Sequence, residues 1–162
     1  MPVKTRKRKQ NINGVTFAIS ICVFVTDFFL KSYLKDNFFL QSIPLIKNIL
    51  HITVIPNTGA AFGVLQGCSP LLLSIGVIFV AILLFMLKRE KNKSAVEMAA
   101  FGLILGGAVS NIFDRIVYGF VIDYIDIRVW PVFNIADTCI TIGAAILVLR
   151  SFKNNAKNLT RV

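Results

Sequence analysis

Four long apolar runs constrain this chain more than any other feature of its sequence. They cover residues 15–34, 70–87, 95–117 and 130–149, and each is close to the ~20 residues that an α-helix needs to cross a bilayer. Hydrophobic residues make up 56% of the 162, and only 16% are charged, against about 25% in an average soluble domain. The sequence therefore predicts an all-α membrane protein, in which residues 1–162 form one integral-membrane domain with four transmembrane helices.

The basic residues predict how these helices are oriented. The net charge of +10 comes from short clusters beside the apolar runs, a pattern of membrane topology and not of a nucleic-acid-binding surface. The clusters lie at 4–9, 88–93 and 150–161. Because cytoplasmic loops are enriched in Lys and Arg, we expect both termini in the cytoplasm and the connections 35–69 and 118–129 outside. Most of the eight acidic residues fall in or near this outer half.

The first apolar run could be mistaken for a secretory signal. No small-x-small cleavage site follows it, and Asp27 and Lys31 interrupt its apolar end. We therefore expect a retained first helix. Asp27 and Lys31 stand four residues apart on that helix, so they can pair and lower the cost of each in lipid. We interpret this pair as mainly structural.

The outer connection 35–69 is too long to be a plain turn. Within it, NILHITVI at 48–55 is rich in β-branched residues and roughly alternates, which predicts a short strand on the membrane surface. The following PNTGAAFG at 56–63 has the composition of a turn. His51 is the only histidine, and no Ser or Cys stands at a spacing typical of a histidine-based triad. The HExxH motif of zinc proteases is also absent from the sequence.

The third run ends in GGAVSNIFDR at 106–115. Gly106 and Ser110 form a pair of small residues four apart, which lets two helix backbones approach closely. Asn111 and Asp114 share a helical face, so a polar edge develops as the helix nears the outer surface. Arg115 could extend to the lipid head groups.

The fourth run carries a carboxylate close to the outer surface. Asn134 and Asp137 are three residues apart on the predicted helix, and Trp130 is expected to mark the outer interface. An ionisable residue just inside the bilayer is by default a candidate for function. Asp123 lies in the short outer connection, which can fold it back over the end of the fourth helix.

Two carboxylates that meet in a poorly solvated pocket cannot easily both ionise, so they share a proton. The ionised partner can then accept a proton from an attacking water, while the protonated partner polarises a peptide carbonyl. Asp123 and Asp137 therefore predict an aspartic-protease pair that needs no metal or other cofactor. Asp126, close to Arg128, is interpreted as a solvated or ion-paired surface residue.

The sequence closely resembles the lipoprotein signal peptidase (signal peptidase II) family through most of its length. The blocks that carry the resemblance occur in order and at fitting spacing within a four-helix chain. They are Asp27 with Lys31, NTGAAFG at 57–63, GGAVSNIFDR at 106–115, GFVIDYI at 119–125 and FNIADTCITIG at 133–143. One departure is Ser110, where the family usually has Gly before Asn111.

The resemblance implies a multi-pass aspartic endopeptidase of the bacterial inner membrane. Such enzymes remove the signal peptide from prolipoproteins after diacylglyceryl has been attached to the cysteine that becomes residue one. The family's catalytic pair maps onto Asp123 and Asp137. The positions that bind substrate or brace the site map onto Asn57, Gly59, Asn111, Asp114, Arg115 and Asn134.

The resemblance also implies a small extramembrane β platform and a loop on the outer face, which suits the 35–69 segment. The expected partners are a lipid-modified prolipoprotein and membrane lipids, and the family is the target of the cyclic peptide globomycin. We expect a monomer.

A proton- or ion-coupled membrane carrier is the competing function, since it would use the same intramembrane acids. Four helices make a small carrier, however, and the acids cluster at one face instead of following a path across the bilayer. A third class, a membrane scaffold subunit, leaves Asp137 unexplained.

The basic clusters generate a testable topology. Reporter fusions after Lys91 and at Val162 should report the cytoplasm, and a fusion in the 40–50 region should report the outside, because Lys and Arg are retained on the cytoplasmic side. A C-terminal reporter active outside would overturn the four-helix topology.

Overall fold

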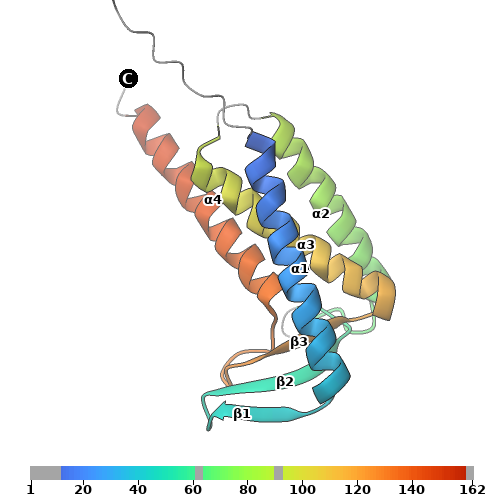
Figure 1. Cartoon of the computed structure of the whole chain (residues 1–162). Helices are drawn as coiled ribbons and strands as arrows, with labels where there is room; N and C mark the ends of the chain where they lie inside the picture. Colours follow the sequence, from blue (N-terminus) through green and yellow to red (C-terminus); the bar gives the residue numbers. More distant parts are fainter. Residues whose placement is uncertain (1–11, 61–63, 90–92, 160–162) are drawn as a thin grey trace, which may run out of the picture.

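The computed structural model describes residues 12–60, 64–89 and 93–159 and contains four long helices and three strands (Figure 1). The elements are α1 (Ile12–Phe38), β1 (Ser42–Ile46), β2 (Leu50–Asn57), α2 (Ser69–Arg89), α3 (Ala95–Tyr118), β3 (Val121–Asp126) and α4 (Ile135–Leu159). All four helices are long and apolar enough to cross a membrane. The predicted four-helix membrane protein is confirmed.

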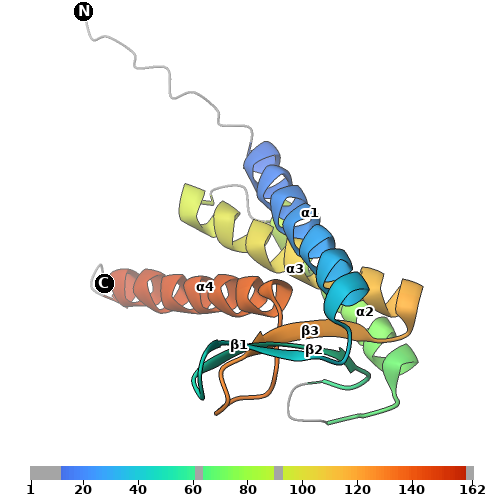
Figure 2. The same ribbon diagram turned by 60° about the horizontal axis from the view of Figure 1, so that its bottom comes forward.

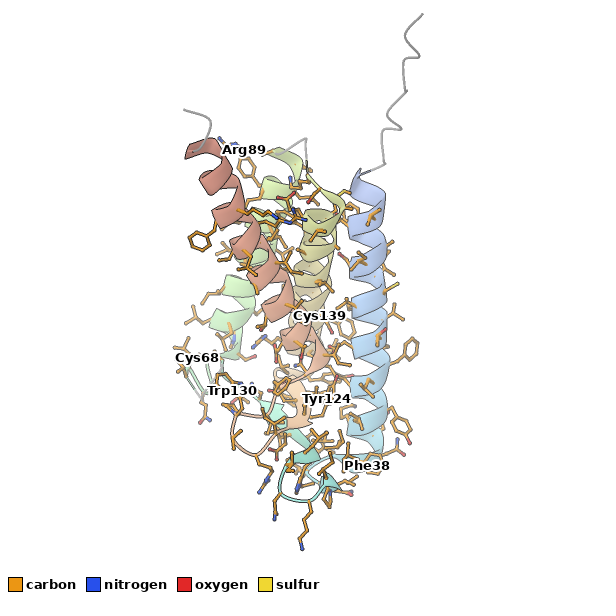
Figure 3. All side chains as sticks on the ribbon, turned by 90° about the vertical axis from the view of Figure 1, so that its left-hand side faces the viewer. Phe38, Cys68, Arg89, Tyr124, Trp130 and Cys139 are labelled. Atoms are coloured by element: carbon orange, nitrogen blue, oxygen red, sulfur yellow. The ribbon has the colours of Figure 1, made fainter. Side chains whose placement is uncertain are left out.

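The strands lie at one end of the helices, and the basic ends of the helices lie at the other (Figures 1 and 2). Figure 3 places Arg89, at the end of α2, opposite Phe38 and Trp130 along the length of the molecule. The described basic residues at the C-terminal ends of α2 and α4 therefore lie at the same end of the molecule, as the sequence predicts. The N-terminal basic cluster and residues 61–63 of PNTGAAFG lie outside the described residues.

Helix α3 is the most buried of the four and packs against α1, α2 and α4. Its contact with α1 depends on small residues, since a Cβ on Gly106 would lie 2.6 Å from the carbonyl oxygen of Ser20. Hydroxyl groups of α1 add hydrogen bonds to backbone carbonyls of α3, such as that from Ser20 Oγ to Gly102 O at 3.1 Å. The close approach predicted from Gly106 is confirmed.

The strands form an antiparallel sheet in the order β1-β2-β3 beyond the C-terminal end of α1. The strand predicted at 48–55 corresponds to β2, whereas β1 and β3 had no separate prediction from their residues. A buried cluster of Leu34, Val54, Ile122 and Tyr124 fastens the sheet to α1. The extramembrane β platform that the resemblance implies is therefore present, and its edge strand β3 carries Asp123.

Helix α4 begins five residues later than the predicted boundary of 130 and continues to Leu159. Residues 131–134 instead run alongside β3, where Phe133 exchanges backbone hydrogen bonds with Ile125. Pro131 has no N–H, and Asn134 takes the non-helical capping position that asparagine favours, so the helix starts only at Ile135. Asp137 therefore lies in the first turn of α4, not two turns inside it.

Replacing Gly106 by Val should destabilise the protein. The new side chain would force α1 and α3 apart, and overpacking of this kind costs about 1–3 kcal/mol. We expect a lower midpoint of thermal unfolding in detergent for Gly106→Val. Ala81→Val, which adds bulk on the exposed face of α2, should leave the midpoint close to that of the unmodified protein. Equal midpoints for both variants would contradict the packing described for α3.

Candidate active site

The two aspartates singled out in the sequence line one pocket where the sheet meets the ends of the helices. Asp123 comes from β3 and Asp137 from the first turn of α4, and the cavity between them has a volume of about 460 Å³. Asn57, Gly59, Asn111 and Arg115 line the same cavity. The fold thus brings together six of the residues predicted for the site, from β2 and the segment after it, α3, β3 and α4.

Asp123 is almost fully buried and receives one amide donor on each carboxylate oxygen. Asn134 Nδ2 donates to Oδ1 at 2.7 Å, and Asn57 Nδ2 donates to Oδ2 at 2.8 Å. Burial raises the pKa of Asp123 to about 7, and the negative charge of Asp137 acts in the same direction. The two amides oppose this rise because they stabilise the ionised carboxylate.

Asp137 is held from two sides. Asn111 Nδ2 of α3 donates to its Oδ1 at 2.7 Å, and the backbone N–H of Asn134 donates a longer bond of 3.4 Å to Oδ2. In return, Asn134 Oδ1 accepts from the Asp137 N–H at 2.8 Å, which is the reciprocal pattern of a helix cap. The expected placement of Asn134 within the fourth helix is wrong, because α4 starts at Ile135 and Asn134 is its cap.

Asn134 consequently bridges the two carboxylates with a single amide. Its oxygen caps the helix that carries Asp137, and its nitrogen donates to Asp123. A third bond, from Nδ2 to Asn111 Oδ1 at 3.3 Å, connects the two amides to each other. Any shift of Asn134 would change the positions of both aspartates.

Lys31 ties this polar layer to α1. Its ammonium lies 2.7 Å from Asp27 and 2.9 Å from Asp114, and it donates to Asn111 Oδ1 at 2.9 Å. The predicted pairing of Asp27 with Lys31 is confirmed, but the pair is not isolated. Lys31 fixes the oxygen of Asn111, which leaves the Asn111 nitrogen free to face Asp137. Asp114 in turn accepts from the Ile122 N–H, next to Asp123 in β3.

Arg115 points toward the pocket edge and not to a lipid-facing position. Its NH2 group donates to the carbonyl of Gly59 at 3.2 Å, and Asn57 Oδ1 accepts from the Gly59 N–H at 2.9 Å. A Cβ on Gly59 would lie 2.8 Å from the carbonyl oxygen of Val64, so a larger residue would displace this segment. The segment that follows β2 is thereby joined to α3 through Arg115 and to Asp123 through Asn57.

The interpretation of Asp126 as a solvated or ion-paired surface residue is correct for the ion pair and wrong for the surface position. Asp126 is ion-paired with Arg128, but its side chain is buried and also accepts from Thr53 Oγ1 at 2.9 Å. Burial raises its pKa, yet the hydrogen bonds from the Arg128 backbone and from Thr53 outweigh this and lower the pKa overall. Asp126 does not line the pocket and holds the turn after β3 instead.

Sequence reasoning missed the wall of the pocket formed by Trp130, Pro131, Val132 and Phe133. These residues were assigned to the fourth helix, and Pro131 followed by a capping asparagine was the signal that could have placed them outside it. Among the described residues, no group of three or more His, Cys, Asp or Glu side chains is arranged to hold a metal ion.

Comparison with known proteins gives a consistent result. The family described as Signal peptidase (SPase) II matches residues 19–153. A lipoprotein signal peptidase of Halothermothrix orenii is 46% identical over 109 residues, which cover 67% of this chain and 74% of that protein. Another, from Caldicellulosiruptor bescii, is 37% identical over 145 residues, covering 90% and 95% of the two chains.

The fold is similar to that of a solved bacterial membrane enzyme. The two structures superpose with a TM-score of 0.82 at 29% sequence identity, over 89% of this chain and 91% of the other. The matched family segment, residues 19–153, contains every aspartate and asparagine described in this site. This chain therefore belongs to the signal peptidase II family and is a multi-pass membrane peptidase.

Proposed function

We propose that this protein is an aspartic endopeptidase that cleaves diacylglyceryl-modified prolipoproteins on the N-terminal side of the lipidated cysteine. Membership of the signal peptidase II family supports cleavage of signal peptides. The observation that carries the aspartic mechanism is the pairing of Asp123 and Asp137 in one pocket, each held by asparagine amides.

Two carboxylates in one poorly solvated pocket share a single proton, so one can act as the acid and the other as the base. Asp123 is buried with a pKa of about 7, so at neutral pH it can keep the shared proton, which leaves Asp137 ionised. We assign Asp137 as the general base and Asp123 as the general acid.

The reaction then follows from these roles. Asp137 takes a proton from a water molecule as the water oxygen attacks the carbonyl carbon of the scissile peptide bond. Asp123 donates a hydrogen bond to the carbonyl oxygen, which becomes negatively charged in the tetrahedral intermediate. When the C–N bond breaks, a carboxyl group delivers a proton to the departing amine of the lipidated cysteine. The products are a signal peptide with a new carboxyl terminus and a lipoprotein with a free amine.

The position of the pocket fits a substrate that is itself embedded in lipid. The pocket lies where the sheet joins the helices, so water can reach the scissile bond while the apolar signal peptide stays between or beside the helices. The acyl chains of the modified cysteine can remain in the bilayer. The enzyme is expected to work as a monomer in the bacterial cytoplasmic membrane, with both termini in the cytoplasm, the pocket at the outer face and globomycin as an inhibitor.

Nothing in the arrangement of the described polar groups favours the carrier function. Asp27 and Asp114 both pair with Lys31 in the same layer as the pocket, and this layer lies toward one end of the helices. The direct test is incubation of the purified protein in detergent with a lipid-modified prolipoprotein. Cleavage that globomycin blocks supports the proposal, and absence of cleavage by folded protein overturns it.

Substitution of either pocket aspartate should abolish cleavage. Asp123→Asn and Asp137→Asn should each lower kcat by at least ~1,000-fold, because an amide can neither share the proton nor act as the base. The double variant should be hardly worse than either single one, since residues that act as a unit are non-additive. Asp36→Asn, which removes an exposed carboxylate, is the matched control and should retain full activity. An active, folded Asp137→Asn would exclude the assigned mechanism.

The pH dependence of cleavage should follow the pKa of Asp123. Activity should fall as the pH rises through about 7, because Asp123 then loses the shared proton. The Asn57 amide lowers the pKa of Asp123, so Asn57→Ala should raise that pKa and move the alkaline limb of kcat/KM to higher pH. Asn37→Ala, at an exposed position on α1, should leave the limb in place. A shift of the limb to lower pH in Asn57→Ala would show that the limb reports another group.

A further inference from the structure

The first turn of α4 has an unusual set of partners. The first N–H groups of a helix have no partner within the helix and must find one elsewhere. In α4, the Ile135 N–H donates to the Tyr124 hydroxyl at 3.1 Å, and the Ala136 N–H donates to Asp27 Oδ1 at 3.2 Å. The Asp137 N–H donates to Asn134 Oδ1. Only the last of these bonds is an ordinary local cap.

Asp27 is the centre of this arrangement. Its Oδ2 accepts from Lys31 at 2.7 Å and from the Ser110 hydroxyl at 2.6 Å, and its Oδ1 accepts from the Tyr124 hydroxyl at 3.3 Å and from Ala136. One fully buried carboxylate thus joins α1, α3, β3 and the start of α4. A negative charge at a helix N-terminus is also favourable for the helix dipole.

Tyr124 provides the contact between the two segments that carry the aspartates. It is the neighbour of Asp123 in β3, and its side chain is 2% exposed in the cluster below α1. Its hydroxyl accepts from Ile135 and donates to Asp27. Burial and the nearby Asp27 raise the pKa of Tyr124, so the hydroxyl keeps its proton at any working pH.

We propose that Tyr124 is a positioning residue for the reaction, which sets the first turn of α4, and with it Asp137, at its distance from Asp123. The backbone of Tyr124 continues directly from Asp123, and its hydroxyl holds the residue two positions before Asp137. This proposal rests on the aspartic mechanism proposed above. It assigns a role to a hydroxyl that lines no part of the pocket.

Ser110 allows the positioning role to be separated from a merely structural one. Its hydroxyl binds the same carboxylate as Tyr124 but at the other oxygen, and it makes no bond to the start of α4. Loss of either hydroxyl removes one hydrogen bond from Asp27. Only the loss at Tyr124 also leaves the Ile135 N–H without a partner.

The experiment compares Tyr124→Phe with Ser110→Ala in the cleavage assay. Tyr124→Phe keeps the ring in the buried cluster, and we expect kcat to fall by ~10-fold with KM nearly unchanged, since small misplacements of catalytic groups are costly. The alkaline limb of kcat should move to lower pH, because a looser pair raises the pKa of Asp123 less. Ser110→Ala should lower the midpoint of thermal unfolding but leave both kcat and the limb unchanged. Tyr33→Phe, at an exposed tyrosine, controls for loss of a hydroxyl.

Two outcomes would overturn the proposal. One is a Tyr124→Phe protein with unchanged kcat and an unchanged pH limb, and the other is an equal change in both from Ser110→Ala.

Hydrogen exchange of the unmodified protein gives a test that does not depend on any variant folding. The amides of Ile135 and Ala136 should exchange as slowly as those inside α4, and rapid exchange would refute the hydrogen bonds. The exchange measurement does not depend on the aspartic mechanism. An active Asp123→Asn variant would exclude that mechanism, and the exchange result would still test the hydrogen bonds at the start of α4.

Discussion

The burial of a charged lysine among the helices is the constraint on which the rest of the structure depends. An isolated ammonium in a poorly solvated interior is very costly, so Lys31 requires partners on every side. Asp27, Asp114 and Asn111 supply them from α1 and α3. The oxygens that contact Lys31 accept further hydrogen bonds, Asp27 Oδ2 from Ser110 and Asp114 Oδ2 from the Ile122 N–H. The other oxygen of Asp27 accepts from Tyr124 and from the start of α4. Satisfying one cation thus fixes four elements relative to one another.

The proposed chemistry depends on this framework more than on contacts of the aspartates alone. Asn111 faces Asp137 because Lys31 occupies its oxygen, and Asn134 faces Asp123 because its own oxygen caps α4. An asparagine has separate donor and acceptor ends, so fixing one end orients the other. The carboxylates therefore receive donors whose direction is set by structural bonds. Buried polar networks of this kind specify one arrangement when all of their members have partners.

The membrane setting explains why the polar layer is placed where it is. Helices α1, α2 and α4 bury little of their surface in the protein and present large apolar side chains to lipid, so charges can be tolerated only in the shared interior or at an end. The sheet lies at one end of the helices (Figures 1 and 3), and the pocket that Asp123 and Asp137 line is formed between them. The sheet supplies Asp123 without placing a strand in the hydrocarbon region of the bilayer, where the unpaired backbone groups of a strand would be costly.

The sequence by itself determined the four helices, the pairing of Asp27 with Lys31, the close approach at Gly106 and the strand in β2. Each of these depends on local composition or on a spacing within one element, which a linear pattern records. Only the tertiary structure decided that Asn134 caps α4, that Asp126 is buried and that Tyr124 and Ser110 contact Asp27. The contacts of Tyr124 and Ser110 with Asp27, and that of Asp126 with Thr53, join elements far apart in sequence. The cap at Asn134 is local, but its amide is oriented by Asp123 and Asn111 from other elements. The partners in these contacts are chosen by which unsatisfied groups the packing of the helices and the sheet brings together.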